Sequence, residues 1–298
     1  MNYITISNKL MGNPDRRIPG VTRRISEFIT RTQKNYVIRS KTHKLDPNSE
    51  IVVSLTTFPV RNKVACISIK SLLMQTMMPC KIIVWLAKNQ YDIIPEDFKE
   101  LEYKGVTFRF VDDLKSHKKY YYSLKEYRNK LVVTVDDDLI YPENLIENLY
   151  KKHLEFPECV VCYRGRTVSF TDNRINPYSE WKINTKHGIK EPTYLVMPST
   201  GGGVLYPHDC VSEELFNLDK IMELAPSADD LWVKWMHLLK GTKVIKSQYT
   251  CPILSHLKTV NDEELSAVNT IENDKVIERL SETYPSAYRR MLDEFQKN

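Results

Sequence analysis

Four short apolar runs, separated by amphipathic segments, are the feature of this 298-residue chain that most restricts its fold. Five or six apolar residues in a row, bounded by turn residues, are typical of a strand buried on both faces. Such strands, alternating with helices, predict an α/β domain whose mainly parallel central sheet is flanked by helices. The predicted strands are residues 51–56, 81–86, 106–111 and 131–135. The predicted helices are residues 64–75, 120–129 and 144–154.

The second half of the chain is less regular. Residues 164–192 are polar, contain two prolines and predict a long loop, while 272–297 predict two amphipathic helices divided at Pro285. Between these segments we expect helices over 212–224 and 228–240 and a strand over 242–250. We therefore expect three parts: a basic helical N-terminal extension (1–49), an α/β domain (50–260) and amphipathic C-terminal helices (261–298).

The positive charge of the chain is concentrated at its N-terminus. Residues 1–50 hold ten lysines and arginines and four acidic residues, whereas the whole chain has a net charge of +5. A basic arm suits an anionic lipid surface or a phosphate-bearing substrate, and equally a solvated helix. Because the rest of the chain is nearly neutral, we expect no nucleic-acid partner.

The chain shows no signal for secretion or membrane insertion. Its first residues lack a basic segment followed by a long apolar run, and no window reaches about 18 consecutive apolar residues. Of the six cysteines only Cys159 and Cys162 have metal-type spacing, and one such pair without a second is weak evidence for a zinc site. We therefore expect reduced thiols and a cytoplasmic location, with any membrane contact peripheral and made by the basic arm.

Three consecutive aspartates, Asp136, Asp137 and Asp138, directly follow the fourth predicted strand. Adjacent carboxylates repel one another unless a cation is near, and Mg²⁺ or Mn²⁺ prefers oxygen ligands of this kind. In an extended chain, residues 136 and 138 lie on one side and residue 137 on the other. The pattern predicts a metal bound by Asp136 and Asp138, with Asp137 directed toward a ribose or the sheet. The alternative is a polar turn before Pro142.

Other polar residues follow the first and third predicted strands. Because ligands bind at the carboxyl ends of parallel strands, these loops are candidates for a nucleotide site. Backbone groups there can contact a base, an arginine can pair with phosphate, and an aspartate can accept from base or ribose. No P-loop and no dinucleotide-binding glycine motif is present. The candidate nucleotide-binding residues are Thr56, Thr57, Arg61, Asp112 and Lys118.

Several segments together resemble GT-A-fold glycosyltransferases. Residues 131–142 are similar to the D-x-D region of that family, and 52–59 to its first strand and nucleotide loop. Residues 201–206 resemble its glycine-containing acceptor-side segment, and 228–232 its acidic pair at a helix start. The segments follow one another in the family's order, and the nearest general likeness is to bacterial sugar transferases that assemble capsule or lipopolysaccharide.

The resemblance implies a GT-A-like fold and a metal-dependent transfer from a nucleotide-diphosphate sugar, most often a UDP-sugar, to a glycan or lipid-linked acceptor. It implies that Asp229 or Asp230 is the general base of an inverting reaction, that His256 is a third metal ligand, and that Gly202 and Gly203 contact the nucleotide sugar. The alternative for Asp230 is a helix-capping box with Ser227.

Three other functions remain open. Nucleotidyl transfer to a sugar phosphate would keep the fold class, but such enzymes carry a glycine-rich loop after the first strand, and residues 56–62 contain no glycine. A metal-dependent phosphodiesterase or nuclease would use the aspartates as a two-metal site. A non-catalytic protein would bind a membrane or partner through the basic arm and the amphipathic C-terminal helices.

Overall fold

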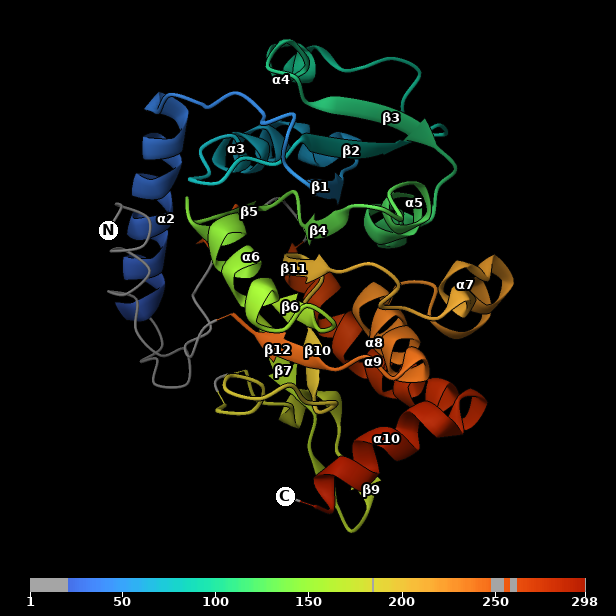
Figure 1. The fold of residues 1–298 in the computed structure, drawn as a ribbon. Coiled ribbons are helices and arrows are strands. Elements are labelled where there is room, and N and C mark those ends of the chain that lie inside the picture. The colour runs from blue at the N-terminus through green and yellow to red at the C-terminus, as the bar shows by residue number, and fades with distance from the viewer. Residues whose placement is uncertain (1–20, 184, 248–254, 258–261, 298) are drawn as a thin grey trace.

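The computed structural model describes residues 21–183, 185–247, 255–257 and 262–297. Within these ranges the centre of the molecule is a seven-stranded sheet with the order β12-β6-β11-β4-β1-β2-β3 (Figure 1). Its strands are β1 (Ile51–Thr56), β2 (Lys81–Ala87), β3 (Thr107–Val111), β4 (Leu131–Val135), β6 (Val160–Cys162), β11 (Gly202–Tyr206) and β12 (Val244–Lys246).

The sheet is mainly parallel, as predicted. Strands β3, β2, β1 and β4 run parallel to their neighbours, and so do β6 and β12. Only β11 is inserted against this direction, antiparallel to both β4 and β6. Because of this reversal, the start of β11 lies at the same edge of the sheet as the carboxyl end of β4. The four predicted strands of the first half are confirmed to within a residue at either end.

Helices cover both faces of the sheet. On one face, Val53 and Val84 pack in one core cluster with residues of α3 and α6, and on the other face Val52 and Trp85 pack against Tyr122 of α5. Burial on both faces explains why these strands are apolar without alternation. The helices of the first half are α2 (Val21–Arg39), α3 (Asn62–Leu72), α4 (Lys99–Tyr103), α5 (Lys118–Glu126) and α6 (Leu145–Glu155).

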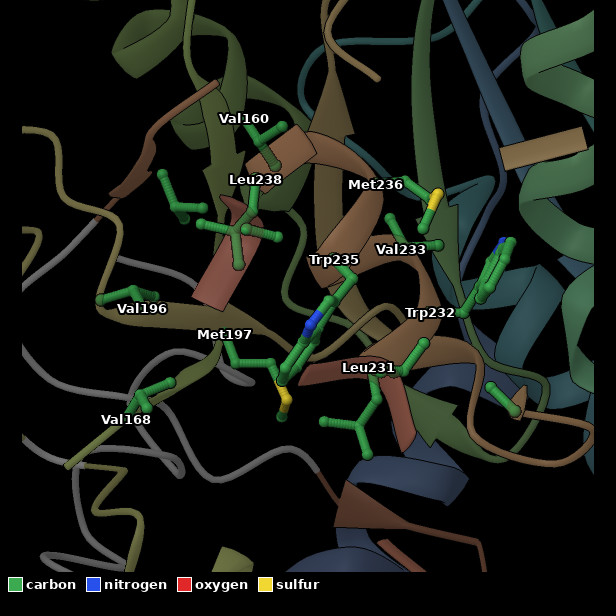
Figure 2. Packing of buried hydrophobic residues seen from close by; sticks show 14 of the residues in the cluster. Val160, Val168, Val196, Met197, Leu231, Trp232, Val233, Trp235, Met236 and Leu238 are labelled. Carbon is green, nitrogen blue, oxygen red and sulfur yellow. The ribbon is translucent and has the colours of Figure 1, made fainter. Parts of the chain in front are cut away.

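A second core lies between the sheet and the helices of the second half. Figure 2 shows α8 side chains, among them Trp235, facing Met197 of β10 (Val196–Pro198). The final helices lie against α8 (Figure 1), and their apolar residues Val276 and Leu280 are buried in this core. These buried residues of the final helices are therefore not available for a membrane or a partner. The helices are α7 (Leu218–Leu224), α8 (Asp229–Lys240), α9 (Asp262–Thr283) and α10 (Pro285–Phe295).

Residues 164–192 are not the unbroken loop that the sequence predicts. They hold three short strands, β7 (Gly165–Thr167), β8 (Phe170–Thr171) and β9 (Arg174–Ile175), of which β7 pairs with β10 and β8 with β9. Strands of two or three residues carry no readable periodicity, so the polar composition hid them. Short 3-10 helices complete this part and the loops: η2 (Pro59–Arg61), η3 (Glu96–Phe98), η4 (Lys115–His117), η5 (Tyr178–Glu180) and η6 (Glu213–Phe216).

The N-terminal helix α2 packs along α3 (Figure 1) and against β13 (Ser255–His256), which pairs with β5 (Leu139–Ile140). The first part of the basic arm, residues 1–20, lies outside the described residues, as does the end of the predicted strand 242–250. Among the described helices, none has the length and apolar character needed to cross a bilayer.

Candidate active site

The candidate site lies at the carboxyl edge of the sheet, where β4 ends and β11 begins. Val135, the last residue of β4, is paired with Gly202, the first residue of β11. The aspartates therefore emerge beside the glycine segment, although 65 positions separate them in the sequence. The start of α8 closes the same region, because Thr200, just before the glycines, hydrogen-bonds to Asp229 and Asp230.

Lys119 joins the two acidic clusters. Its Nζ lies 2.6 Å from Oδ1 of Asp136 and 2.9 Å from Oδ2 of Asp229, and its side chain is only 4% exposed. Burial opposes the charge of the ammonium, but Asp136, Asp229 and Asp230 outweigh that cost and hold the pKa of Lys119 well above its usual value. One buried cation thus connects the aspartate cluster after β4 to the acid pair on α8.

Arg61 neutralises the other two aspartates. Its Nη1 lies 3.0 Å from Oδ1 of Asp137 and 2.9 Å from Oδ2 of Asp138. The chain turns at Asp137 and Asp138, so it lacks the extended geometry on which the predicted alternation rests; a metal held by Asp136 and Asp138 stays a prediction. Burial raises the pKa of Asp137, which Arg61 opposes. The mutual repulsion of the three carboxylates is therefore met by the protein's own cations.

Asp229 and Asp230 open α8 but do not cap it. The capping residue is Ala228, and no side chain makes a cap hydrogen bond, so the capping box with Ser227 is not formed. Instead Thr200 donates its backbone N–H to Oδ1 of Asp230 (2.8 Å) and its hydroxyl to Oδ2 of Asp229 (2.7 Å). A satisfied helix cap therefore does not account for the two acids.

The two acids differ in their protonation. Burial would raise the pKa of Asp229, but Lys119 and other partners hold it well below its usual range. Burial and the neighbouring charge of Asp229 raise the pKa of Asp230 to about 6. Two adjacent carboxyl groups whose pKa values are driven apart in this way are typical of an acid–base site.

The three glycines are required by the packing of the site itself. A Cβ on Gly201 would lie 1.6 Å from Oδ2 of Asp136, and one on Gly202 would lie 2.8 Å from Cβ of Arg164. Gly203 has a φ of +95°, which side chains rarely adopt. These glycines therefore make room for Asp136 and Arg164. Direct contact of Gly202 and Gly203 with a nucleotide sugar stays a prediction.

His256 is brought next to the aspartates by backbone pairing. It lies opposite Leu139 in the β5–β13 ladder, and the N–H of Leu257 donates to the carbonyl of Asp138 (2.7 Å). Oδ2 of Asp137 is also buried without a hydrogen-bond partner among the described residues. Oxygen and imidazole donors suit Mn²⁺ or Mg²⁺. In the described part of the chain, however, no three His, Cys, Asp or Glu side chains are gathered into a metal-binding group.

The remaining nucleotide candidates lie along the same edge with different surroundings. The hydroxyl of Thr56 donates to the carbonyl of Trp85 (2.8 Å), and the hydroxyl of Thr57 is buried with no hydrogen-bond partner among the described residues. The side chain of Asp112 is 83% exposed and 3.2 Å from Nζ of Lys88. Lys118 is buried against Asp113, so the structure does not bring it to Asp136. Their contact with a nucleotide stays a prediction.

The sequence does not single out several residues that the structure places in the site. Thr200 carries no motif, and Tyr141, whose hydroxyl contacts the backbone of Asp136 and Gly201, looks like an ordinary apolar residue. Arg164 and Arg166 fall in the segment predicted as a loop. The sequence analysis selects Lys118, but it is the neighbouring Lys119 that contacts Asp136, while Lys118 contacts Asp113.

Comparisons with known proteins add little to this picture. No protein-family model and no curated protein matches the chain. Among solved structures, a similar chain is a mannosyltransferase from Pyrobaculum calidifontis in complex with GDP-Man and Mn²⁺. It is 10% identical, with a TM-score of 0.49, and the match covers 98% of this chain and 80% of that chain. A likeness of this size carries no argument about function, so the function is argued from the site.

Proposed function

We propose that this protein is a GT-A-like glycosyltransferase that moves a sugar from a nucleotide-diphosphate donor to a hydroxyl group of a glycan or lipid-linked acceptor. The observation that carries the proposal is the bridge made by Lys119 between Asp136 and Asp229. It joins the aspartates that follow β4 to a carboxyl pair suited to proton transfer. Glycosyl transfer to a hydroxyl needs both functions side by side: stabilisation of an anionic leaving group and a base for the acceptor.

Asp230 is the better of the two candidates for the base. A general base works best when its pKa lies near the working pH, and the pKa of Asp230 is raised to about 6. Asp229, whose pKa is lowered, stays ionised and holds Lys119 in place. In this proposal Asp230 takes the proton of the acceptor hydroxyl as oxygen attacks the anomeric carbon from the side opposite the leaving group, which inverts the configuration there.

The positive charge around the aspartates suits the leaving nucleotide diphosphate. Lys119 forms an ion pair with Asp136, and Arg61 forms ion pairs with Asp137 and Asp138. Preorganised cations stabilise charge that grows on phosphate oxygens. A bound Mn²⁺ or Mg²⁺ would add further neutralisation of the diphosphate, held by Asp136, Asp138 and His256.

The finer features of the proposal follow from the family resemblance. The donor is proposed to be a UDP-sugar, with its nucleoside near Thr56, Thr57, Asp112 and Asp137. The acceptor is proposed to belong to capsule or lipopolysaccharide assembly. We also propose a cytoplasmic enzyme that meets the membrane peripherally through its basic N-terminal arm.

A direct test measures binding and turnover across a panel of nucleotide sugars with Mn²⁺, Mg²⁺ or EDTA. The wild-type protein is compared with Asp136→Asn and with the control Asp172→Asn. Asp172 is an exposed turn residue with a positive φ, which asparagine also adopts readily. We expect one nucleotide sugar to bind and be turned over, with loss of turnover only in Asp136→Asn. The proposal fails if no nucleotide sugar binds under any condition. Release of pyrophosphate from a nucleoside triphosphate would replace it with nucleotidyl transfer.

A further inference from the structure

Two arginines, Arg164 and Arg166, lie close to the segment 199–202 and have no role in the chemistry proposed above. Arg164 follows β6, and its carbonyl accepts a hydrogen bond from the N–H of Ser199 (3.0 Å), the residue before Thr200. Its side chain starts over Gly202, 2.8 Å from the position that a Cβ would take there. Arg164 thus stands next to the segment that holds Asp230.

Arg166 lies two residues further on, in β7 (Gly165–Thr167). Its guanidinium lies 5.0 Å from the centre of the Tyr178 ring, and its Nη1 donates to the carbonyl of Trp181 (3.1 Å). Burial and the charge of Asp230 raise the pKa of Tyr178, while Arg166 and Arg164 act in the opposite direction. Tyr178 is therefore near enough to sense both arginines and Asp230, which places these four side chains in one neighbourhood.

Neither arginine is paired with an acid. Across the part of the chain that the structure describes, Arg61 and Arg128 each face a carboxylate, whereas no carboxylate pairs with Arg164 or Arg166. Both side chains are half-buried, and a partly desolvated cation without a counter-charge is unfavourable. An anion would relieve that cost, and the guanidinium group suits phosphate and carboxylate because it can donate two parallel hydrogen bonds.

We propose that Arg164 and Arg166, with Tyr178, form a subsite for a negatively charged group, phosphate or carboxylate, on the acceptor. The proposal rests on the function proposed above, in which Asp230 deprotonates the acceptor. Arg164 connects the subsite to Ser199, the residue before Thr200, and Tyr178 lies close enough to Asp230 to respond to its charge. The donor diphosphate is assigned in this proposal to Asp136 and its cations. The acceptor would therefore be an acidic sugar or a sugar phosphate, held by its charge with one hydroxyl toward Asp230.

The test compares neutral methyl glycosides with uronic acids and sugar 6-phosphates as acceptors. Kinetics are measured for the wild type, Arg164→Gln, Arg166→Gln and the control Arg174→Gln, an exposed arginine of β9. In each substituted subsite we expect the KM for anionic acceptors to rise at least about tenfold, as for loss of a charge-assisted hydrogen bond. The KM for neutral acceptors and the donor dissociation constant should stay unchanged. Comparing the KM of uronic acids with that of sugar 6-phosphates shows whether the subsite prefers a carboxylate or a phosphate.

Two results would overturn the subsite. One is a wild-type enzyme that uses neutral and anionic acceptors equally well. The other is a weakened donor affinity in Arg164→Gln and Arg166→Gln, which would assign the arginines to the donor diphosphate. Calorimetric titration with glucose 6-phosphate in the absence of donor separates the two proposals. If the wild type binds this probe through the arginines yet binds no nucleotide sugar, the subsite stands and the proposed transfer reaction fails.

Discussion

Replacing Asp230 with asparagine should make the protein more stable at alkaline pH and inactive. The pKa of Asp230 in the fold is about 6, compared with about 3.9 for an unperturbed aspartate. Between these values the folded protein keeps a proton that the unfolded chain has released, so stability falls as the pH rises from about 4 to about 6. At about 1.4 kcal/mol per pKa unit, ionised Asp230 costs the fold about 2–3 kcal/mol above pH 6.

Asparagine removes that cost without removing the backbone hydrogen bond. Its Oδ1 can still accept from the backbone N–H of Thr200. We therefore expect Asp230→Asn to be about 2–3 kcal/mol more stable than the wild type at pH 8, and equally stable near pH 4. If Asp230 is the base, the same variant should lose about 10²-fold or more in turnover. In the wild type, kcat/KM should fall as the pH is lowered through about 6, because Asp230 becomes protonated there.

The assay is urea unfolding at pH 4, 6 and 8, with Asp229→Asn as the matched control. The pKa of Asp229 is lowered by Lys119, so this carboxylate stabilises the fold above about pH 4 and loses that effect only in stronger acid. Asp229→Asn should therefore be destabilised at pH 8, by about 3 kcal/mol or more, because Lys119 loses a buried partner. The reasoning is refuted if both variants shift stability in the same direction at pH 8.

Three further predictions concern the aspartate cluster. Gly201→Ala should keep the fold but displace the carboxylate of Asp136, because the new Cβ would lie 1.6 Å from its Oδ2. The affinity for the donor, measured by calorimetry, should therefore fall, and an unchanged affinity would contradict this. Lys119→Met should lower the free energy of unfolding by about 3–5 kcal/mol. The control Lys125→Met, at an exposed lysine of the same helix, should change it by less than about 1 kcal/mol. Equal effects of the two substitutions would contradict the bridge made by Lys119. In initial-rate measurements EDTA should abolish transfer and Mn²⁺ should restore it. Full activity in EDTA would mean that the protein's own cations stabilise the leaving diphosphate without a metal.

The sequence was sufficient to predict the framework of the fold. Residues 51–56 and 131–135 are apolar throughout because both faces of a parallel strand are covered, and this pattern is local enough to read directly. The order of predicted elements along the chain also placed Asp136–Asp138 at the end of a strand and Asp229–Asp230 at the start of a helix. The short strands β7 to β9 escaped prediction because two or three residues show no period.

What only the tertiary structure decided is which side chains meet. The turn at Asp137 places Asp137 and Asp138 on Arg61 and leaves Asp136 to Lys119, where an extended chain would have paired Asp136 with Asp138. These ion pairs join residues that are far apart in the sequence, so no local pattern records them.

The glycines and the lysines show the same division. Composition singles out Gly201–Gly203 as a place of close approach, but only the packing shows that Asp136 and Arg164 occupy the space. The sequence analysis proposes Lys118 as a nucleotide-binding residue, but the rotation of α5 turns Lys119 toward the aspartates and Lys118 toward Asp113. Residue type and local period are properties of the chain itself. The partner of a buried charge depends on how separate elements pack, and that is set by the fold as a whole.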